Sequence, residues 1–93
     1  MIKSFDCKET EKIFNRKFSK KLPHEIQKTA FRKLRMLNIS FSLNDFKVPP
    51  GNRLKKFHGS RNEQYSIRIK IKCRICFEWN DNDAYNVEIV DYH

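Results

Sequence analysis

The chain has 93 residues, which is enough for one domain and too few for two domains with separate cores, so we expect residues 1–93 to form a single domain. Its 20 Lys and Arg residues outnumber 11 Asp and Glu residues, and the net charge of +9 favours a polyanionic partner over a neutral metabolite. Eight Phe, three Tyr and one Trp argue against disorder, while the lack of a long apolar segment and of a signal peptide predicts a cytoplasmic protein without a membrane span.

The first half of the chain shows mostly helical patterns. Residues 2–5 alternate apolar and polar side chains, which predicts a short N-terminal strand, and Ile13 and Phe14 lie among charged residues that indicate a helix over residues 8–17. Pro23 suits the first turn of a second helix, whose apolar residues share one face: Ile26, Ala30, Leu34 and Leu37. We interpret the basic residues elsewhere on this second helix as a solvated face rather than a dedicated RNA surface.

The middle of the chain marks the end of the helical part. Residues 42–45, Ser-Leu-Asn-Asp, predict a capped single helical turn. The Pro-Pro-Gly-Asn sequence of residues 49–52 is a strong helix breaker. Apolar and polar side chains then alternate with the period of a strand over residues 65–71 and again over residues 73–79.

The end of the chain completes the predicted sheet. Residues 80–83, Asn-Asp-Asn-Asp, predict a turn, and the alternation returns with Tyr85, Val87 and Ile89. We therefore predict an α+β fold, in which an N-terminal strand and two helices pack on a curved antiparallel sheet.

One face of this sheet is expected to be mainly apolar and the other mainly basic. The basic face and its rim carry these cations: Arg53, Lys55, Lys56, Arg61, Arg68, Lys70 and Arg74. Residues 78–93, in contrast, contain acids but no Lys or Arg, so the polyanion-binding surface must come from the earlier part of the chain. Cations that hold phosphates, next to rings that stack on bases, suit single-stranded RNA.

The cysteines Cys7, Cys73 and Cys76 are odd in number, and without an export signal this favours reduced thiols over a disulfide scaffold. Cys73 and Cys76 have CxxC spacing, but residues three apart on a strand point to opposite faces. No second CxxC or His pair stands at the spacing of zinc ligands. We therefore expect no metal site and no cofactor.

Residues 91–93, Asp-Tyr-His, are the strongest candidates for chemistry, although a frayed polar tail is the alternative. RNA carries its own nucleophile, the 2′-hydroxyl, so a metal-free ribonuclease needs a base, an acid and cations for the charged phosphorane. His93 could be the base or the acid, because an imidazole titrates near neutral pH. The other catalytic candidates are Lys55 and Arg74 for the phosphorane oxygens, and Asp91 and Tyr92 for positioning.

Several segments form a specific combination, although each is a weak signal alone. They are the opening Met-Ile-Lys-Ser-Phe, the run from Asn52 to Arg61, Gln64-Tyr-Ser-Ile-Arg-Ile69, Arg74-Ile-Cys-Phe77, Asp83-Ala-Tyr85 and Asp91-Tyr-His93. Taken together they span nearly the whole chain, and they resemble the HigB toxins of the RelE/ParE superfamily.

This resemblance implies a RelE-like fold and a metal-independent endoribonuclease that cleaves messenger RNA in the ribosomal decoding site and inhibits translation. It also implies contacts with 16S ribosomal RNA and a HigA-like antitoxin with a helix-turn-helix domain. In such toxins the terminal Asp-Tyr-His and the strand arginine belong to the active site, here Asp91, Tyr92, His93 and Arg74. Lys55 stands where the family often has His, which suits phosphate binding better than acid–base work.

The chain departs from the family pattern at the sheet and at one loop. Lys70-Ile71-Lys72 and Cys73 replace the usual turn-forming residues and the aromatic before the strand arginine, so the hairpin is less well specified. The usual Lys-Gly-Asp-Arg loop becomes His58-Gly-Ser-Arg61, which places a His near the site. With this His added to the cations of the basic face and rim, the RNA-binding candidates are Arg53, Lys56, His58, Arg61 and Arg68.

Two other functions remain as alternatives at this point. A gyrase-poisoning toxin like the ParE proteins is disfavoured by the intact Asp-Tyr-His end, because those toxins generally lack the catalytic residues. A non-catalytic RNA-binding module would need the basic surface but not His93.

Overall fold

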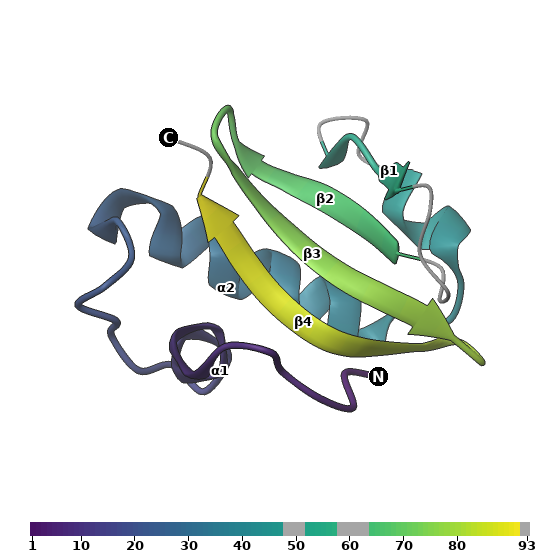
Figure 1. Ribbon diagram of the computed structural model, residues 1–93, viewed down its shortest axis with the longest axis horizontal. Coiled ribbons are helices and arrows are strands. Elements are labelled where there is room, and N and C mark those ends of the chain that lie inside the picture. The colour runs from purple at the N-terminus through teal and green to yellow at the C-terminus, as the bar shows by residue number, and fades with distance from the viewer. Residues whose placement is uncertain (48–51, 58–63, 92–93) are drawn as a thin grey trace.

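The computed structural model describes residues 1–47, 52–57 and 64–91. Within these ranges the elements are α1 (Lys8–Phe14), α2 (His24–Ile39), the 3-10 helix η1 (Leu43–Lys47), β1 (Lys55–Phe57), β2 (Gln64–Lys70), β3 (Cys73–Asn80) and β4 (Asp83–Asp91). The strands form one antiparallel sheet in the order β1-β2-β3-β4, and α2 lies across one face of it (Figure 1). In the described part of the chain, no helix has the length and apolar character needed to cross a membrane.

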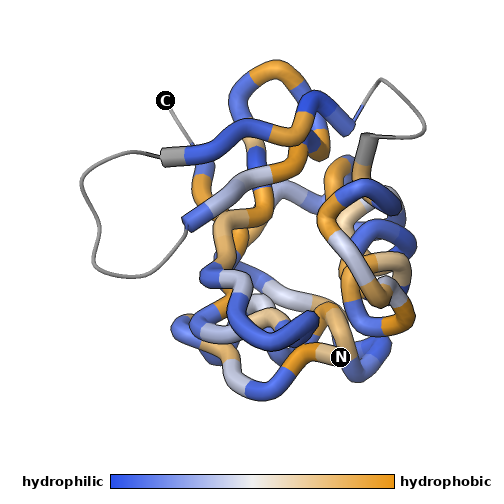
Figure 2. Tube along the Cα trace, turned by 90° about the vertical axis from the view of Figure 1, so that its right-hand side faces the viewer, coloured by the Kyte–Doolittle hydropathy of each residue, from blue (hydrophilic) through white to orange (hydrophobic). Residues whose placement is uncertain are grey.

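The core lies between α2 and the sheet, and the predicted α+β class is confirmed. The four apolar positions of α2 that were predicted to share a face are all buried. The strands, along which hydrophobic and hydrophilic residues alternate (Figure 2), contribute mainly Tyr65, Ile67, Cys73, Ile75, Phe77, Trp79, Val87 and Ile89. From η1, Phe46 is fully buried, and its ring centroid lies 5.7 Å from that of Phe77 and 5.6 Å from that of Trp79.

Residues 2–5 do not form the strand that their alternation predicted. They run beside β4 and make two isolated parallel bridges with it, Ile2 with Ala84 and Phe5 with Val87. Between these bridges Asn86 has a φ of 52°, and its backbone N donates to the side-chain Oγ of Ser4 at 2.8 Å. The irregular backbone at Asn86 explains why the two bridges do not join into a regular ladder.

The first helix ends earlier than predicted, at Phe14 instead of residue 17. Arg16 has a φ of 63°, and its backbone N donates to the carbonyl oxygen of Ile13 at 3.0 Å. A residue in this left-handed region cannot continue a right-handed helix, so the chain turns here toward α2.

The predicted helical turn at residues 42–45 is present as η1, which begins one residue later. The side-chain Oδ2 of Asp45 accepts from the backbone N of Phe41 at 2.9 Å and from that of Ser42 at 3.2 Å. Of the predicted helix breaker at residues 49–52, only Asn52 lies within the described residues.

The turn between β3 and β4 confirms the prediction for residues 80–83. Asp81 and Asn82 have φ values of 50° and 66°, as a type I′ hairpin turn requires at both central positions. Asn and Asp tolerate this conformation better than most other residues, so the sequence and the geometry agree.

The turn between β2 and β3 differs from the prediction, which continued the strand to Ile71. β2 ends at Lys70, and Ile71 and Lys72 form the turn without positive φ. The register shifts by one residue between Arg68 and Lys70, which is the mark of a bulge. Ile71 is consequently 82% exposed rather than part of the apolar face.

A second bulge, in β4, changes which side chains of this strand are buried. The register shifts opposite Cys76 and Glu78, where Asn86 has its positive φ. Ala84 is therefore buried, whereas Tyr85, which was expected on the apolar face, is only half-buried on the other side.

Candidate nucleic-acid interface

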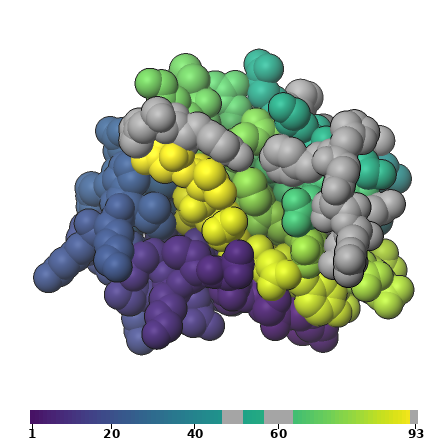
Figure 3. Space-filling view, viewed as in Figure 1, coloured from purple at the N-terminus to yellow at the C-terminus, as the bar shows by residue number. Residues whose placement is uncertain are grey.

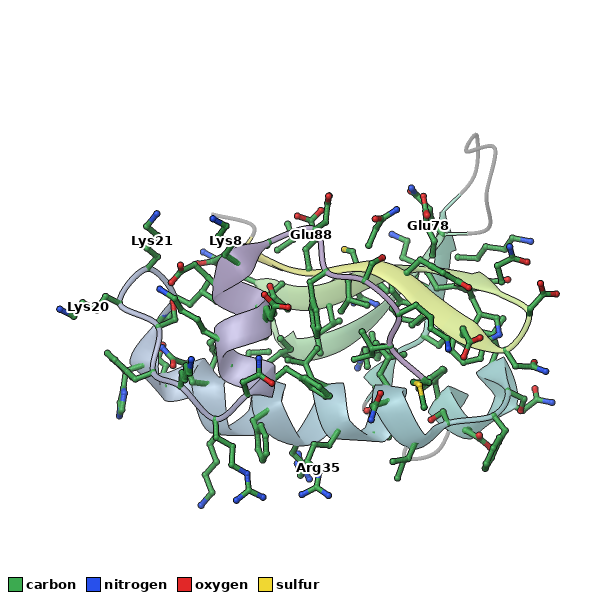
Figure 4. All side chains as sticks on the ribbon, turned by 90° about the horizontal axis from the view of Figure 1, so that it is seen from below. Lys8, Lys20, Lys21, Arg35, Glu78 and Glu88 are labelled. Carbon is green, nitrogen blue, oxygen red and sulfur yellow. The ribbon has the colours of Figure 1, made fainter. Side chains whose placement is uncertain are left out.

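The face of the sheet turned away from α2 is called the open face. The strand register places on it the side chains of Lys55, Ser66, Arg68, Arg74, Cys76, Glu78, Glu88 and Val90. Figure 4 shows Glu78 and Glu88 pointing away from α2, while Arg35 points to the opposite side of the molecule. In Figure 3 parts of β3 and β4 lie at the surface on this side, bordered by the N-terminal segment.

The guanidinium group of Arg74 is held on the open face by three hydrogen bonds. Nε donates to the Oγ of Ser66 at 2.7 Å, and Nη2 donates to the carbonyl oxygens of Arg53 at 2.5 Å and Ser66 at 3.3 Å. Because these acceptors are a hydroxyl and two carbonyl oxygens, they orient the positive charge without neutralising it. In the described part of the chain, Nη1 keeps both of its N–H groups for a ligand.

The basic part of the open face consists of Arg53, Lys55, Arg68 and Arg74. Arg68 is the direct cross-strand partner of Arg74, and Lys55 is the partner of Ser66, the residue that holds Arg74. Like charges directly opposite each other in a sheet are destabilising on their own. An anion between them, such as a phosphate, would remove this repulsion.

Lys33 adds positive charge from the other side of the sheet. Its Nζ, which extends from α2, donates to the carbonyl oxygen of Arg68. Burial lowers the pKa of Lys33, and the neighbouring cations Arg32, Arg68 and Arg74 lower it further. The two arginines of the open face thus reach the Lys33 amine electrostatically from across the sheet.

Lys56, one of the predicted RNA-binding residues, lies apart from this basic part. Its partner across the strands is Tyr65, whose ring packs on Phe77 in the core. The Nζ of Lys56 lies 5.9 Å from the centroid of the Tyr65 ring. Because neighbouring residues on a strand point to opposite faces, Lys55 is on the open face and Lys56 is on the helix side.

Asp91 also lies on the helix side, although the family resemblance assigned it to one active site with Arg74. The cross-strand partner of Arg74 is Val90, whereas Asp91 pairs with Cys73. The Sγ of Cys73 donates to Oδ1 of Asp91 at 3.4 Å. Burial raises the pKa of the Cys73 thiol to about 11, with a further contribution from Asp91, so the thiol stays neutral at physiological pH.

A cavity of about 670 Å³ connects Asp91 with two residues of the basic part. It lies between the start of α2 and the β2–β3 turn, and its lining includes Arg53, Arg68, Lys70, Ile71 and Asp91. Asp91 and the two arginines therefore line one cavity at the end of the sheet, although the strand register places Asp91 on the helix side.

The acidic part of the open face consists of Asp6, Glu78 and Glu88, which line a hollow of about 350 Å³. Glu78 accepts hydrogen bonds from the Nδ2 of Asn86 at 2.8 Å and the Nε2 of Gln64 at 3.4 Å. Burial raises the pKa of Glu88, and the nearby Asp6 raises it further. The charge boundary that the sequence predicted near residue 78 is thus present within a single face of the sheet.

Four of the predicted site residues, His58, Arg61, Tyr92 and His93, lie outside the described residues, and their roles stay predictions. The cysteines of the CxxC pair lie on opposite faces, as expected, with Cys73 buried and Cys76 half-buried on the open face. Sequence reasoning did not single out Ser66. Its position in the strand alternation with Arg68 was the available signal, because this placed both residues on the basic face.

Comparisons with known proteins give consistent results. Residues 3–93 match the family model of the RelE-like toxin of type II toxin-antitoxin system HigB. The chain is 35% identical over 65 residues to Toxin HigB-1 of Vibrio cholerae, which covers 70% of this chain and 68% of that protein. It is 33% identical over 67 residues to an uncharacterized protein of Haemophilus influenzae, which covers 72% of this chain and 66% of that protein.

Proposed function

The chain belongs to the HigB-like family of RelE-like toxins from type II toxin–antitoxin systems, and we propose that it is an endoribonuclease that cleaves messenger RNA on the ribosome. The observation that carries this proposal is the oriented guanidinium of Arg74, which has no carboxylate partner among the described residues and lies next to Arg68 and Lys55 on the open face. Such a group stabilises the negative charge that develops on a phosphorane.

In the proposed reaction the 2′-hydroxyl of the message attacks the neighbouring phosphorus, and the 5′-oxygen of the next nucleotide leaves. Arg74 contacts the phosphorane oxygens through Nη1, and Lys55 and Arg68 hold the flanking phosphates. His93 moves the proton as base or acid, and Tyr92 positions it. Asp91 anchors the end of β4 against Cys73, next to these two residues in the sequence.

The family also implies an antitoxin as a partner. We propose that this antitoxin is HigA-like with a helix-turn-helix domain, and that the toxin works in the cytoplasm, where it contacts the message and 16S ribosomal RNA. Expression of the toxin without its antitoxin should therefore arrest growth. Folded toxin that leaves growth and translation unchanged would count against this assignment.

The decisive experiment is cell-free translation with mapping of the message ends, carried out alongside cleavage on programmed ribosomes in EDTA. The proposal expects cuts within the message that leave a 2′,3′-cyclic phosphate. Metal-dependent cuts that leave 5′-phosphates would overturn the mechanism. Inhibition of translation without cuts would indicate a binding module, and double-strand breaks in DNA treated with gyrase would indicate a gyrase poison.

A further inference from the structure

The side chain of Ser66 contacts the guanidinium group of Arg74. Ser66 has no exposed surface, so its hydroxyl is shielded from water, and its Oγ accepts from Nε of Arg74 at 2.7 Å. We propose that Ser66 is a positioning residue that sets the plane of this guanidinium for phosphate contact, an inference that rests on the proposed ribonuclease function. Ser66 itself does not touch the substrate in this arrangement.

Geometry explains why this one hydroxyl has a large effect on the guanidinium. The five N–H groups of an arginine lie in one plane, so fixing Nε and Nη2 also fixes the direction of Nη1. Ser66 supplies two of the three acceptors, through Oγ and through its carbonyl oxygen at 3.3 Å from Nη2. Without Oγ the side chain could rotate about its long aliphatic stem, and Nη1 would point at the phosphate for only part of the time.

The third acceptor, the carbonyl oxygen of Arg53, is itself held in place by its neighbour Asn52. Asn52 is 1% exposed, and its Nδ2 donates to the carbonyl oxygen of Phe46 at 3.3 Å. Arg53 follows with a φ of 45°, which turns its carbonyl group toward Nη2 of Arg74. The guanidinium is therefore held between a central strand and an anchored segment that leads into β1.

A purely structural role for Ser66 is the competing explanation, because any buried hydroxyl can affect stability. A double-mutant cycle separates the two explanations. If Ser66 acts through Arg74, Ser66→Ala slows cleavage only while the arginine is present. If Ser66 only supports the fold, Ser66→Ala has the same effect on cleavage whether or not Arg74 is present.

The experiment measures single-turnover cleavage on saturating programmed ribosomes for wild type, Ser66→Ala, Arg74→Ala and the double variant. We expect Ser66→Ala to lower the limiting rate by about tenfold to a hundredfold, with little change in ribosome affinity. In the Arg74→Ala background the same change should have less than about a twofold effect. Ser19→Ala is the matched control, since Ser19 is also fully buried and its hydroxyl donates to Glu9 of α1 instead of contacting Arg74.

A second measurement does not depend on cleavage. In the folded toxin, the Nε–H of Arg74 should exchange slowly with water in NMR spectra, exchange much faster in Ser66→Ala, and stay slow in Ser66→Thr. Equal exchange in all three proteins would overturn the inference, as would equal effects of Ser66→Ala in both backgrounds of the cycle. Wild-type toxin that does not cut messages at all would instead overturn the proposed function, and the exchange data would still decide whether Ser66 orients Arg74.

Discussion

The basic part and the acidic part of the open face meet on β3, which carries Arg74 in one and Glu78 in the other, yet their charges are held differently. In the basic part Arg74 is held by a hydroxyl and by carbonyl oxygens, which leave its charge intact. In the acidic part the carboxylate of Glu78 accepts from the amides of Asn86 and Gln64, while Glu88 faces Asp6. Neutral partners thus hold both Arg74 and Glu78, and the two signs of charge lie in separate parts of one face. A bound RNA backbone should follow the basic part and avoid the other.

The substitution Arg74→Ala tests most directly the role assigned to the basic part. Loss of one group that stabilises transition-state charge typically costs about 10²–10⁴ in rate, and we expect a loss of that size in message cleavage. Ribosome affinity should change little, because Lys55 and Arg68 remain. The control is Arg35→Ala on the outer side of α2 (Figure 4). Cleavage by the Arg74 variant at a wild-type rate would remove this residue from the mechanism.

His93→Gln tests whether proton transfer is separate from charge stabilisation. If the basic part only binds phosphate and His93 moves the proton, this variant should also lose about 10²–10⁴ in cleavage rate. Its affinity for programmed ribosomes should match that of the wild type, measured by co-sedimentation. A variant that cuts normally would move the acid–base role to another residue.

Salt dependence compares the two parts of the open face directly. Removing one cation that binds a phosphate should lower the slope of log affinity against log salt by about one. We therefore expect Arg68→Gln to flatten the slope for ribosome binding by about one. Glu78→Gln, the matched change in the acidic part, should leave the slope unchanged. If both variants gave the same slope, the division of the face into two parts would have no role in binding.

The smallest expected effect concerns the stability of the acidic part. Because the folded state raises the pKa of Glu88, it binds this proton more tightly than the unfolded chain does. The wild type therefore loses stability as pH rises from the usual carboxyl range through the raised pKa. Glu88→Gln avoids this loss, and because solvent screens this partly exposed carboxylate, the variant should be more stable than the wild type at neutral pH by less than about 1 kcal/mol.

Denaturant unfolding at neutral and acidic pH checks this prediction. The difference between Glu88→Gln and the wild type should shrink as the pH falls below the usual carboxyl range. The exposed carboxylate of Glu11 offers a control, Glu11→Gln. A stability difference for Glu88→Gln that is the same at both pH values would show that ionisation of this residue does not cause it.

The fold was predictable where residue type and geometry impose the same conformation. The apolar spacing along α2 fixed its buried face, and Asp81 and Asn82 suit positive φ, which located the β3–β4 turn. The turn at Ile71 and Lys72 was not predictable, because neither residue type requires a turn there and the alternation continues through Ile71. Only the tertiary pairing, with its bulge, ends β2 one residue earlier.

The sequence predicted the basic residues of the site, but it predicted only in part the face of the sheet on which each residue lies. Strand alternation correctly placed Arg68 and Arg74 on one face. It could not show that Asp91 pairs with Cys73, because the side on which a residue lies depends on bulges that do not appear in a period-two pattern. Ser66 was missed because a single Ser in a strand carries no chemical signal until its partner is known.

The pairing between the two ends of the described chain has a consequence for how the protein is made. Ser4 bonds to Asn86 across 82 residues, and Thr10 of α1 bonds to Ile89 across 79. Contacts between residues so far apart in sequence form late, because a long stretch of chain must be ordered before they can close. During synthesis the N-terminal segment must therefore wait for β4 to leave the exit tunnel. Under the proposed function, this order of events separates the toxin's own translation from the assembly of the surface that would interrupt translation.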